Sequence, residues 1–362
     1  MLELPKQDSA KIVRQAMEFR RPDRLPVYDG FWSEFAEAWR RAYGLGPDAD
    51  IEDHYWLDMR VLTAREEFFP TRVREIKRAG EDVWRDEGWG RVVRRKEGTY
   101  FSETVDRILK DPRDLDRLQF DPAGLEVRYD GFLDDVRRHH EKGQAIFLKI
   151  GGPFIRTTFL RGEVEFLMDM AEDEPLARAL VEKVGEHLLQ IGLESLKRSR
   201  GRDYGVWIFD DMCNANSPMF SPATFERVFL PTYKRMVATL KAAGARWVML
   251  HCDGNVGPLL DLALEAGIEG INPVEYHAGL DVVKLLDRYA GRLRFVGGAD
   301  NVHILPSGDA ARIRRHIEAI VDAGRNGGVI IGTHSIGPDI SIESYELYRR
   351  IVAERGAYAK GG

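Results

Sequence analysis

The sequence predicts an α/β protein, a single (β/α)8 TIM barrel domain over residues 1–362, with an N-terminal helix within 1–24 and a β-hairpin region at 82–103. Short apolar runs alternate with helical patterns from residue 145 onward, which indicates βαβ units and a parallel sheet. The candidate strands total eight, the number that closes such a barrel. Most of the later strands end in glycine and in acidic or imidazole groups, as at the face where barrel enzymes keep their chemistry. A doubly wound open sheet is the alternative fold.

The composition is that of a globular protein: of 362 residues, 44% are hydrophobic and 31% are charged, and the formal net charge is −6. Because no dense Lys/Arg run is present, we expect no nucleic-acid partner. No apolar run reaches the ~20 residues that span a bilayer, so we expect no membrane contact. The N-terminus lacks a signal pattern, and two cysteines, Cys213 and Cys252, cannot form a disulfide framework. We therefore expect a cytoplasmic protein.

The first third of the chain predicts helices, one strand and a hairpin. Asp8 and Ser9 precede an amphipathic pattern that is typical of a capped helix. Residues 25–28 predict the first strand, and residues 33–80 have a mainly helical pattern. Residues 82–103 change to the strand period with glycines between the runs, which predicts a hairpin. We count one strand of this hairpin among the eight.

The remainder of the chain has a regular rhythm. A helix is predicted at 125–140, and further helical patterns cover 165–198 and 221–243, where Ser221 is a good N-cap and Gly244 a C-terminal stop. The predicted strands are 145–150, 204–209, 246–250, 268–272, 293–296 and 328–332. With residues 25–28 and the hairpin strand, these six complete the eight.

Polar groups follow these strands closely. The run at 247–250 leads into His251, Cys252 and Asp253, and the side chains at 251 and 253 project to one side of an extended chain. Asn255 follows in the same stretch, and other strands end in the same way, with Asp210 and Asp211, Glu275, Asp300 and His334. Polar groups are expensive to bury, so we expect them to line a cavity at the C-terminal face of the barrel.

Metal binding is the sharper interpretation of this face. His251 and Asp253 from one strand and His334 from a later one would make a three-ligand site with an open position, as in catalytic zinc sites. The alternative is that His251 binds a neighbouring carboxylate and that His334 occupies a turn. Cys213 and Cys252 remain alternative ligands, although a free cysteine is more often a small buried hydrophobe.

Seven short motifs follow one another along the chain: Asp86-Glu87-Gly88-Trp89-Gly90, Gly151-Gly152-Pro153-Phe154, Phe209-Asp210-Asp211, His251-Cys252-Asp253-Gly254-Asn255, Asn272-Pro273-Val274-Glu275, Gly297-Gly298-Ala299-Asp300 and His334-Ser335-Ile336. In their order and spacing the chain resembles the uroporphyrinogen decarboxylase superfamily, which includes the zinc-dependent corrinoid methyltransferases. The resemblance extends from Pro22 to the C-terminus and implies a (β/α)8 barrel. True decarboxylases have carboxylate-binding arginines just after the first strand, where residues 27–34 contain none, and a tyrosine at the position of Phe159. We therefore do not expect a true uroporphyrinogen decarboxylase.

The methyltransferase branch implies a function. Its zinc ligands, His-x-Cys on one strand and a Cys on the last, match His251, Asp253 and His334, so the two cysteines are replaced by harder ligands. The resemblance implies an enzyme that holds zinc or another divalent metal and moves a methyl group between a corrinoid carrier, or a methoxylated substrate, and a small acceptor. Glu275 would be a fourth ligand or general base, and Asp210 and Asp211 would orient the acceptor.

No cobalamin-binding segment is recognised in the sequence, so we expect any corrinoid to come on a partner protein. For contacts with the small-molecule substrate we expect Tyr28, Trp32, Trp207, Asn255 and Asp300. One alternative is a lyase or hydrolase in which Asp253, Glu275 and Asp300 do acid–base work on a small carboxylated or phenolic substrate. Another is a non-catalytic protein that binds a tetrapyrrole or an aromatic ligand. The oligomeric state stays open.

Overall fold

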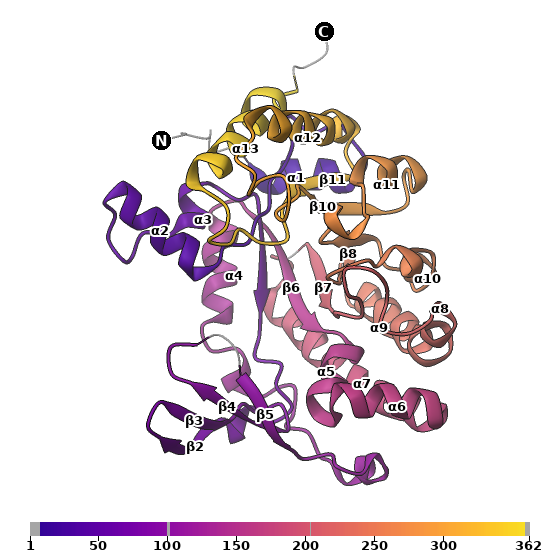
Figure 1. Ribbon diagram of the computed structural model, residues 1–362. Helices are drawn as coiled ribbons and strands as arrows, with labels where there is room; N and C mark the ends of the chain where they lie inside the picture. Colours follow the sequence, from indigo (N-terminus) through magenta and orange to yellow (C-terminus); the bar gives the residue numbers. More distant parts are fainter. Residues whose placement is uncertain (1–7, 100–101, 203, 359–362) are drawn as a thin grey trace.

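A computed structural model describes residues 8–99, 102–202 and 204–358 of the chain. A parallel sheet of seven strands, in the order β1-β6-β7-β8-β9-β10-β11, forms its centre. It curls as a TIM-like barrel wall with helices on the outside (Figure 1). The strands are β1 (Met59–Thr63), β6 (Ala145–Gly151), β7 (Gly205–Phe209), β8 (Trp247–His251), β9 (Gly270–Asn272), β10 (Arg294–Gly298) and β11 (Val329–Gly332). The βαβ prediction is confirmed from residue 145 onward.

Residues 25–28, the predicted first strand, form a short extended segment between the two edges of this sheet. On one side, Tyr28 N–H donates to the Ile331 carbonyl (2.9 Å) and Ile331 N–H to the Pro26 carbonyl (3.0 Å). On the other side, Asp58 N–H, just before β1, donates to the Val27 carbonyl (2.9 Å). A Cβ at Gly332 would lie 1.7 Å from the Tyr28 carbonyl oxygen, so only glycine allows this approach. The segment thus bridges β11 and β1.

Two predictions for the first third of the chain are wrong. The strand β1 lies within residues 33–80, which were predicted as mainly helical, and it pairs in parallel with β6. The hairpin region contributes no strand to the barrel. It is part of a separate antiparallel sheet in the order β2-β3-β4-β5, made of Arg74–Ala79, Asp82–Asp86, Arg91–Lys96 and Ser102–Arg107. In Figure 1 this sheet lies at the opposite end of the molecule from α12 and α13.

The inside of the barrel wall is a packed core. Alternate residues of the strands point inward, and Phe147, Trp207, Met249 and Val296 belong to one buried cluster. The helix α1 (Ser9–Met17) adds Val13 and Met17 to this cluster, so it closes the N-terminal end of the barrel. The predicted cap is confirmed, because the Asp8 side chain accepts a hydrogen bond from Lys11 N–H.

The outer helices cover the other face of the sheet. The predicted helix at 221–243 begins at the confirmed N-cap Ser221, but it is divided by a π-helical turn at Phe225–Phe229. The helices besides α1 are α2 (Ser33–Tyr43), α3 (Ile51–His54), α4 (Phe132–Glu141), α5 (Pro153–Arg161), α6 (Glu163–Glu172), α7 (Glu174–Ser199), α8 (Pro222–Thr224), α9 (Leu230–Ala242), α10 (Leu260–Glu265), α11 (Val282–Arg288), α12 (Ala310–Ala323) and α13 (Ile342–Arg355). Short 3-10 helices are found at Pro70–Arg72, Pro112–Arg117, Glu126–Arg128, Gly257–Leu259, Tyr276–Ala278 and Gly324–Asn326.

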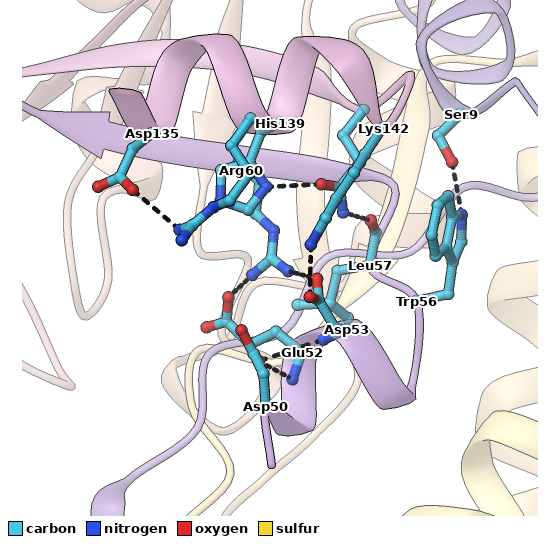
Figure 2. Close-up of polar contacts among 12 residues, drawn as sticks. Ser9, Asp50, Glu52, Asp53, Trp56, Leu57, Arg60, Asp135, His139 and Lys142 are labelled. Atoms are coloured by element: carbon cyan, nitrogen blue, oxygen red, sulfur yellow. Dashed lines mark hydrogen bonds and ion pairs between the residues drawn. The ribbon is translucent and has the colours of Figure 1, made fainter. Parts of the chain in front are cut away.

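A buried arginine joins β1 to the helices beside it (Figure 2). Arg60, which points outward from β1, forms ion pairs with Glu52 and Asp53 of α3. Lys142, just after α4, binds Asp53 as well. Burying the guanidinium is tolerable only because both carboxylates offset its charge. In the part of the chain that the structure describes, no helix is both long and apolar enough to cross a lipid bilayer.

Candidate metal centre and active site

Three predicted ligands meet at the C-terminal end of the parallel strands. His251 is the last residue of β8, Asp253 follows two residues later, and His334 lies two residues after β11. Asp253 Oδ1 is 3.2 Å from His251 Nε2 and 3.3 Å from His334 Nε2. One ligand atom from each of the three residues lies within 4.8 Å of the other two. The structure therefore brings together the residues that the sequence placed in one site.

The tautomer of His251 is fixed by its neighbour on β9. His251 Nδ1 lies 2.6 Å from Asn272 Oδ1. Asn272 Nδ2 donates to the Val296 carbonyl (3.0 Å), which orients the amide so that its oxygen faces the imidazole. Nδ1 of a neutral His251 must then carry the proton, and the lone pair of Nε2 points towards Asp253.

His334 has the same arrangement with a carboxylate. Its Nδ1 is 3.3 Å from Glu275 Oε1, while Glu275 Oε2 accepts from Gly254 N–H (2.5 Å). Burial opposes the charge on both groups, yet their interaction raises the pKa of His334 and lowers the pKa of Glu275. A carboxylate behind a metal-binding imidazole is a common way to orient it. Glu275 thus lies behind His334, and Nε2 of His334 faces Asp253.

The three facing atoms have the chemistry of a cation site. Asp253 Oδ1 is buried, and the Nε2 atoms of both imidazoles face it. Burial alone would raise the pKa of Asp253, but the nearby imidazoles of His251 and His334 lower it. Two donors that bind zinc tetrahedrally at about 2.0–2.1 Å lie about 3.3 Å apart, close to the 3.2 and 3.3 Å that separate Asp253 Oδ1 from the two imidazole nitrogens. The donor set of two imidazoles and one carboxylate fits a divalent metal.

The adjacent residues Asp210 and Asp211 have different surroundings. Asp211 Oδ1 lies 3.9 Å from His251 Nε2 and accepts from Asp253 N–H (3.2 Å). Burial and the charge of Asp253 raise the pKa of Asp211. Asp210 is fully buried and accepts from the first turn of α5, at Ile155 N–H (2.6 Å), and from the Tyr233 hydroxyl (2.6 Å). Its burial raises the pKa to about 7. Asp211 therefore belongs to the histidine group, whereas Asp210 holds the start of α5.

Aromatic rings form one wall of this group. The Phe209 ring stacks on the His251 imidazole, with centroids 4.7 Å apart and planes at 24°. The Trp207 ring lies deeper in the barrel, 6.3 Å from His251 and 6.0 Å from the Tyr28 ring. Burial raises the pKa of Tyr28 to about 12. Of the predicted substrate contacts, Tyr28 and Trp207 thus lie beneath the metal-binding group.

The other predicted substrate contacts lie apart from it. Trp32 precedes α2 and is 48% exposed. The Asn255 amide donates to the Asn216 carbonyl (3.0 Å) and accepts from Gly257 N–H (3.1 Å). Asp300 Oδ1 accepts from the backbone of the loop that follows it, for example from Val302 N–H (2.9 Å). These polar groups of Asn255 and Asp300 bind other parts of the protein, so the contact of all three residues with substrate stays a prediction.

The two cysteines face away from the site. Cys252 and Cys213 both belong to the buried cluster between the sheet and the outer helices. The Cys252 thiol accepts from Met212 N–H (3.3 Å). Because neighbouring residues of an extended chain point to opposite sides, Cys252 is directed away from His251 and Asp253.

Sequence analysis missed two residues of this region. Asn272 is part of a sequence motif that does not reveal its role, which follows from its place opposite His251 in the strand register: it is the partner of the imidazole. Lys149 was read as part of an apolar strand. A single cation at an inward position of a buried strand was the available signal.

The chain is similar to known proteins in sequence family and in fold. The family model described as Uroporphyrinogen decarboxylase (URO-D) matches residues 87–355. Among solved structures, a methyltransferase from Methanosarcina mazei is similar with a TM-score of 0.69 and 17% identity, over 97% of this chain and 99% of that one. A B12-independent methionine synthase from Shewanella sp. W3-18-1 gives a TM-score of 0.40 and 14% identity, over 94% and 95%. No curated protein sequence matches the chain. At 17% identity, the likeness to the Methanosarcina mazei protein shows a shared fold.

Proposed function

The chain belongs to the uroporphyrinogen decarboxylase family, and from this premise we propose that it is a metal-dependent, methyltransferase-like enzyme. One observation carries the proposal. His251 Nε2, Asp253 Oδ1 and His334 Nε2 converge at the C-terminal end of the parallel strands, with contacts of 3.2 and 3.3 Å. Asn272 and Glu275 hold the opposite nitrogens of the two imidazoles. Three protein ligands and an open side are typical of catalytic rather than structural metal sites.

The proposed reaction moves a methyl group from a corrinoid carrier, or from a methoxylated substrate, to a small acceptor. With a corrinoid donor, the cobalt–carbon bond breaks, cobalt keeps the electron pair, and the acceptor heteroatom gains the methyl group and releases a proton. A bound divalent ion supplies Lewis acidity that makes a thiol, hydroxyl or water a better nucleophile at neutral pH. Asp211, 3.9 Å from His251 Nε2, is the carboxylate best placed to take the proton. The corrinoid would come on a partner protein.

The surroundings of Asp29 support a reaction other than porphyrinogen decarboxylation. This residue lies just after the bridging segment, where a decarboxylase would need cations for the substrate carboxylates. Asp29 is 1% exposed and accepts from Thr333 N–H (2.9 Å) and the Tyr345 hydroxyl (3.1 Å). The guanidinium of Arg349 is buried behind it and donates to Tyr345 and to the Tyr55 carbonyl. That arginine is therefore already bound within the protein and cannot act as a substrate fork.

Metal analysis combined with a methyl-transfer assay tests the proposed function. We expect the purified or zinc-reconstituted protein to hold about one equivalent of divalent metal. With free methylcobalamin as donor and 2-mercaptoethanol as acceptor, the visible spectrum of the corrinoid should report demethylation. A chelator should stop the reaction and added zinc should restore it. No bound metal after incubation with zinc, iron or manganese would overturn the proposal and would favour the acid–base lyase.

Replacing Glu275 by glutamine is expected to weaken metal binding about 10- to 100-fold. The amide keeps the size of the side chain but removes the charge that faces His334 Nδ1 at 3.3 Å. Competition with a chromogenic chelator measures the change. Glu265→Gln is the matched control, because Glu265 forms an exposed ion pair with Lys234 (2.7 Å). Equal affinity in Glu275→Gln and the wild type would show that Glu275 does not orient the ligand.

A further inference from the structure

One lysine points into the barrel beside the metal-binding group. On β6, Ala145 and Phe147 belong to the cluster inside the barrel, while Ile146 and Leu148 belong to the cluster outside it. Because side chains alternate along a strand, Lys149 points inward like Phe147. Its partner in the register is Trp207 of β7, which also points inward. Lys149 therefore lies one layer below Phe209 and His251.

The ammonium group of Lys149 reaches up to the aromatic wall. Its Nζ lies 4.1 Å from the centroid of the Phe209 ring, and that ring stacks on His251 with centroids 4.7 Å apart. The ammonium is therefore no farther from the imidazole centroid than the sum of these two distances. This upper limit is within the reach of a small molecule that contacts the metal-binding atoms at one end and Lys149 at the other.

The carboxylates near Lys149 are already bound to other groups. Glu66 Oε1 accepts from the Arg156 guanidinium, and Glu66 Oε2 accepts from Gly151 N–H. Asp211 faces His251 and accepts from Asp253 N–H. In the described part of the chain, Lys149 Nζ has no hydrogen bond or ion pair, and its interaction is with the Phe209 ring.

A half-buried ammonium without a carboxylate is energetically costly. Burial lowers the pKa of Lys149 below its ordinary value, because the charged form has lost part of its hydration. A cation–π contact offsets only a part of this cost. A ligand carboxylate would offset more of it, since charge-assisted hydrogen bonds are among the strongest in proteins. An anion of the substrate is the missing partner that this environment predicts.

We propose that Lys149 binds a carboxylate of the substrate, and that this substrate is an aromatic acid whose reacting oxygen or sulfur lies at His251, Asp253 and His334. The rings of Phe209, Trp207 and Tyr28 line the same wall and suit a flat, unsaturated body. Arg156 is no substitute for Lys149, because it is held by Glu66 and lies over the Trp89 ring at 4.3 Å. This inference deepens the proposed function and rests on it for the position of the reacting atom.

Two probes that differ in one charge test the inference. The zinc-loaded protein is titrated by calorimetry with 3-hydroxybenzoate and with the neutral 3-hydroxybenzamide. We expect the wild type to bind the acid about 10- to 100-fold more tightly than the amide. In Lys149→Met this ratio should fall to about one, with little change in the affinity for the amide. Lys149→Gln, which keeps a polar end without the charge, should show the same loss and guards against a folding defect of the first variant.

Lys142→Met is the matched control, because Lys142 is also half-buried but binds Asp53 at the N-terminal end of the barrel. It should keep the wild-type ratio. Equal binding of the two probes by the wild type, no binding of the acid, or a normal ratio in both Lys149 variants would overturn the inference.

The same titration in His251→Ala, the variant that is expected to lose the metal, separates the role of Lys149 from the proposed metal-dependent function. If the wild type binds no metal, but prefers the acid in a way that depends on Lys149, the carboxylate-binding role of Lys149 stands and the metal-dependent function fails. If the wild type binds zinc and demethylates the corrinoid, but does not prefer the acid, the proposed function stands and the carboxylate-binding role of Lys149 fails.

Discussion

Replacing His251 or Asp253 by alanine is expected to remove the metal from the protein. Each change takes one of three donors from a site whose fourth position is open, and two donors hold a divalent ion poorly. After gel filtration with a chelator, elemental analysis should find less than about a tenth of an equivalent in either variant. His140→Ala is the matched control, because His140 is an exposed histidine in the last turn of α4. It should retain the metal.

The effect of Asp253→Ala on stability should depend on the metal. Without metal, the imidazoles of His251 and His334 hold the pKa of the Asp253 carboxyl below its ordinary value, so removal of this carboxylate should lower the stability of the metal-free protein. With excess zinc, the wild type gains stability by binding the ion in the folded state, and the variant gains none. Thermal unfolding with and without zinc measures both effects. Equal zinc-induced shifts in the two proteins would contradict the assigned ligands.

The fold could be predicted where local pattern and tertiary pairing agree. From residue 145 onward, apolar strands and amphipathic helices alternate regularly, and the observed β6 to β11 follow the predicted strands closely. The strand β1 has only five residues, with Arg60 among them, and its neighbours have a helical pattern. What makes it a strand is its pairing with β6, and no local propensity records that pairing. Residues 25–28 were expected to be extended and are, but their place between β11 and β1 depends on backbone bonds to distant parts of the chain.

The candidate site, like the fold, could be predicted from the sequence only in part. The spacing of His251 and Asp253 predicted that both point the same way, and the structure agrees. The resemblance implies one role for Asp210 and Asp211, yet adjacent residues at a strand end point to opposite sides. Asp210 accordingly faces α5 and Asp211 faces His251. The partner of His251 was beyond sequence reasoning, because Asn272 reaches it through the register of β8 and β9.

Replacing Asp58 by alanine should produce the largest loss of stability, about 3–5 kcal/mol in the free energy of unfolding. Asp58 is fully buried just before β1. Its carboxylate accepts from the Ser9 hydroxyl (2.5 Å), from the Arg24 guanidinium (2.5 and 2.7 Å) and from Val27 N–H (2.9 Å). Alanine would leave a largely buried guanidinium and a buried N–H without their acceptor. Denaturant unfolding at neutral pH measures the loss.

Asp23→Ala is the control for this prediction. Asp23 binds Lys11 at 2.9 Å, but both side chains are well exposed, at 40% and 51%, so the change should cost at most about 1 kcal/mol. Similar losses in the two variants would show that the buried contacts of Asp58 add nothing.

The loss in Asp58→Ala should begin at one place in the barrel. Asp58 holds Val27 N–H through its side chain, and its own N–H donates to the Val27 carbonyl, so it attaches the bridging segment to the β1 edge. Without the carboxylate, this segment should separate from β1 before the whole domain unfolds. Hydrogen exchange should then accelerate at the amides of Asp58, Tyr28 and Ile331, while amides of β7 and β8 keep their protection. Gly332 packs on Tyr28 of the bridging segment and lies two residues before the metal ligand His334. The variant should therefore also bind metal more weakly. Uniform acceleration across the sheet would instead show that the barrel opens as one cooperative unit.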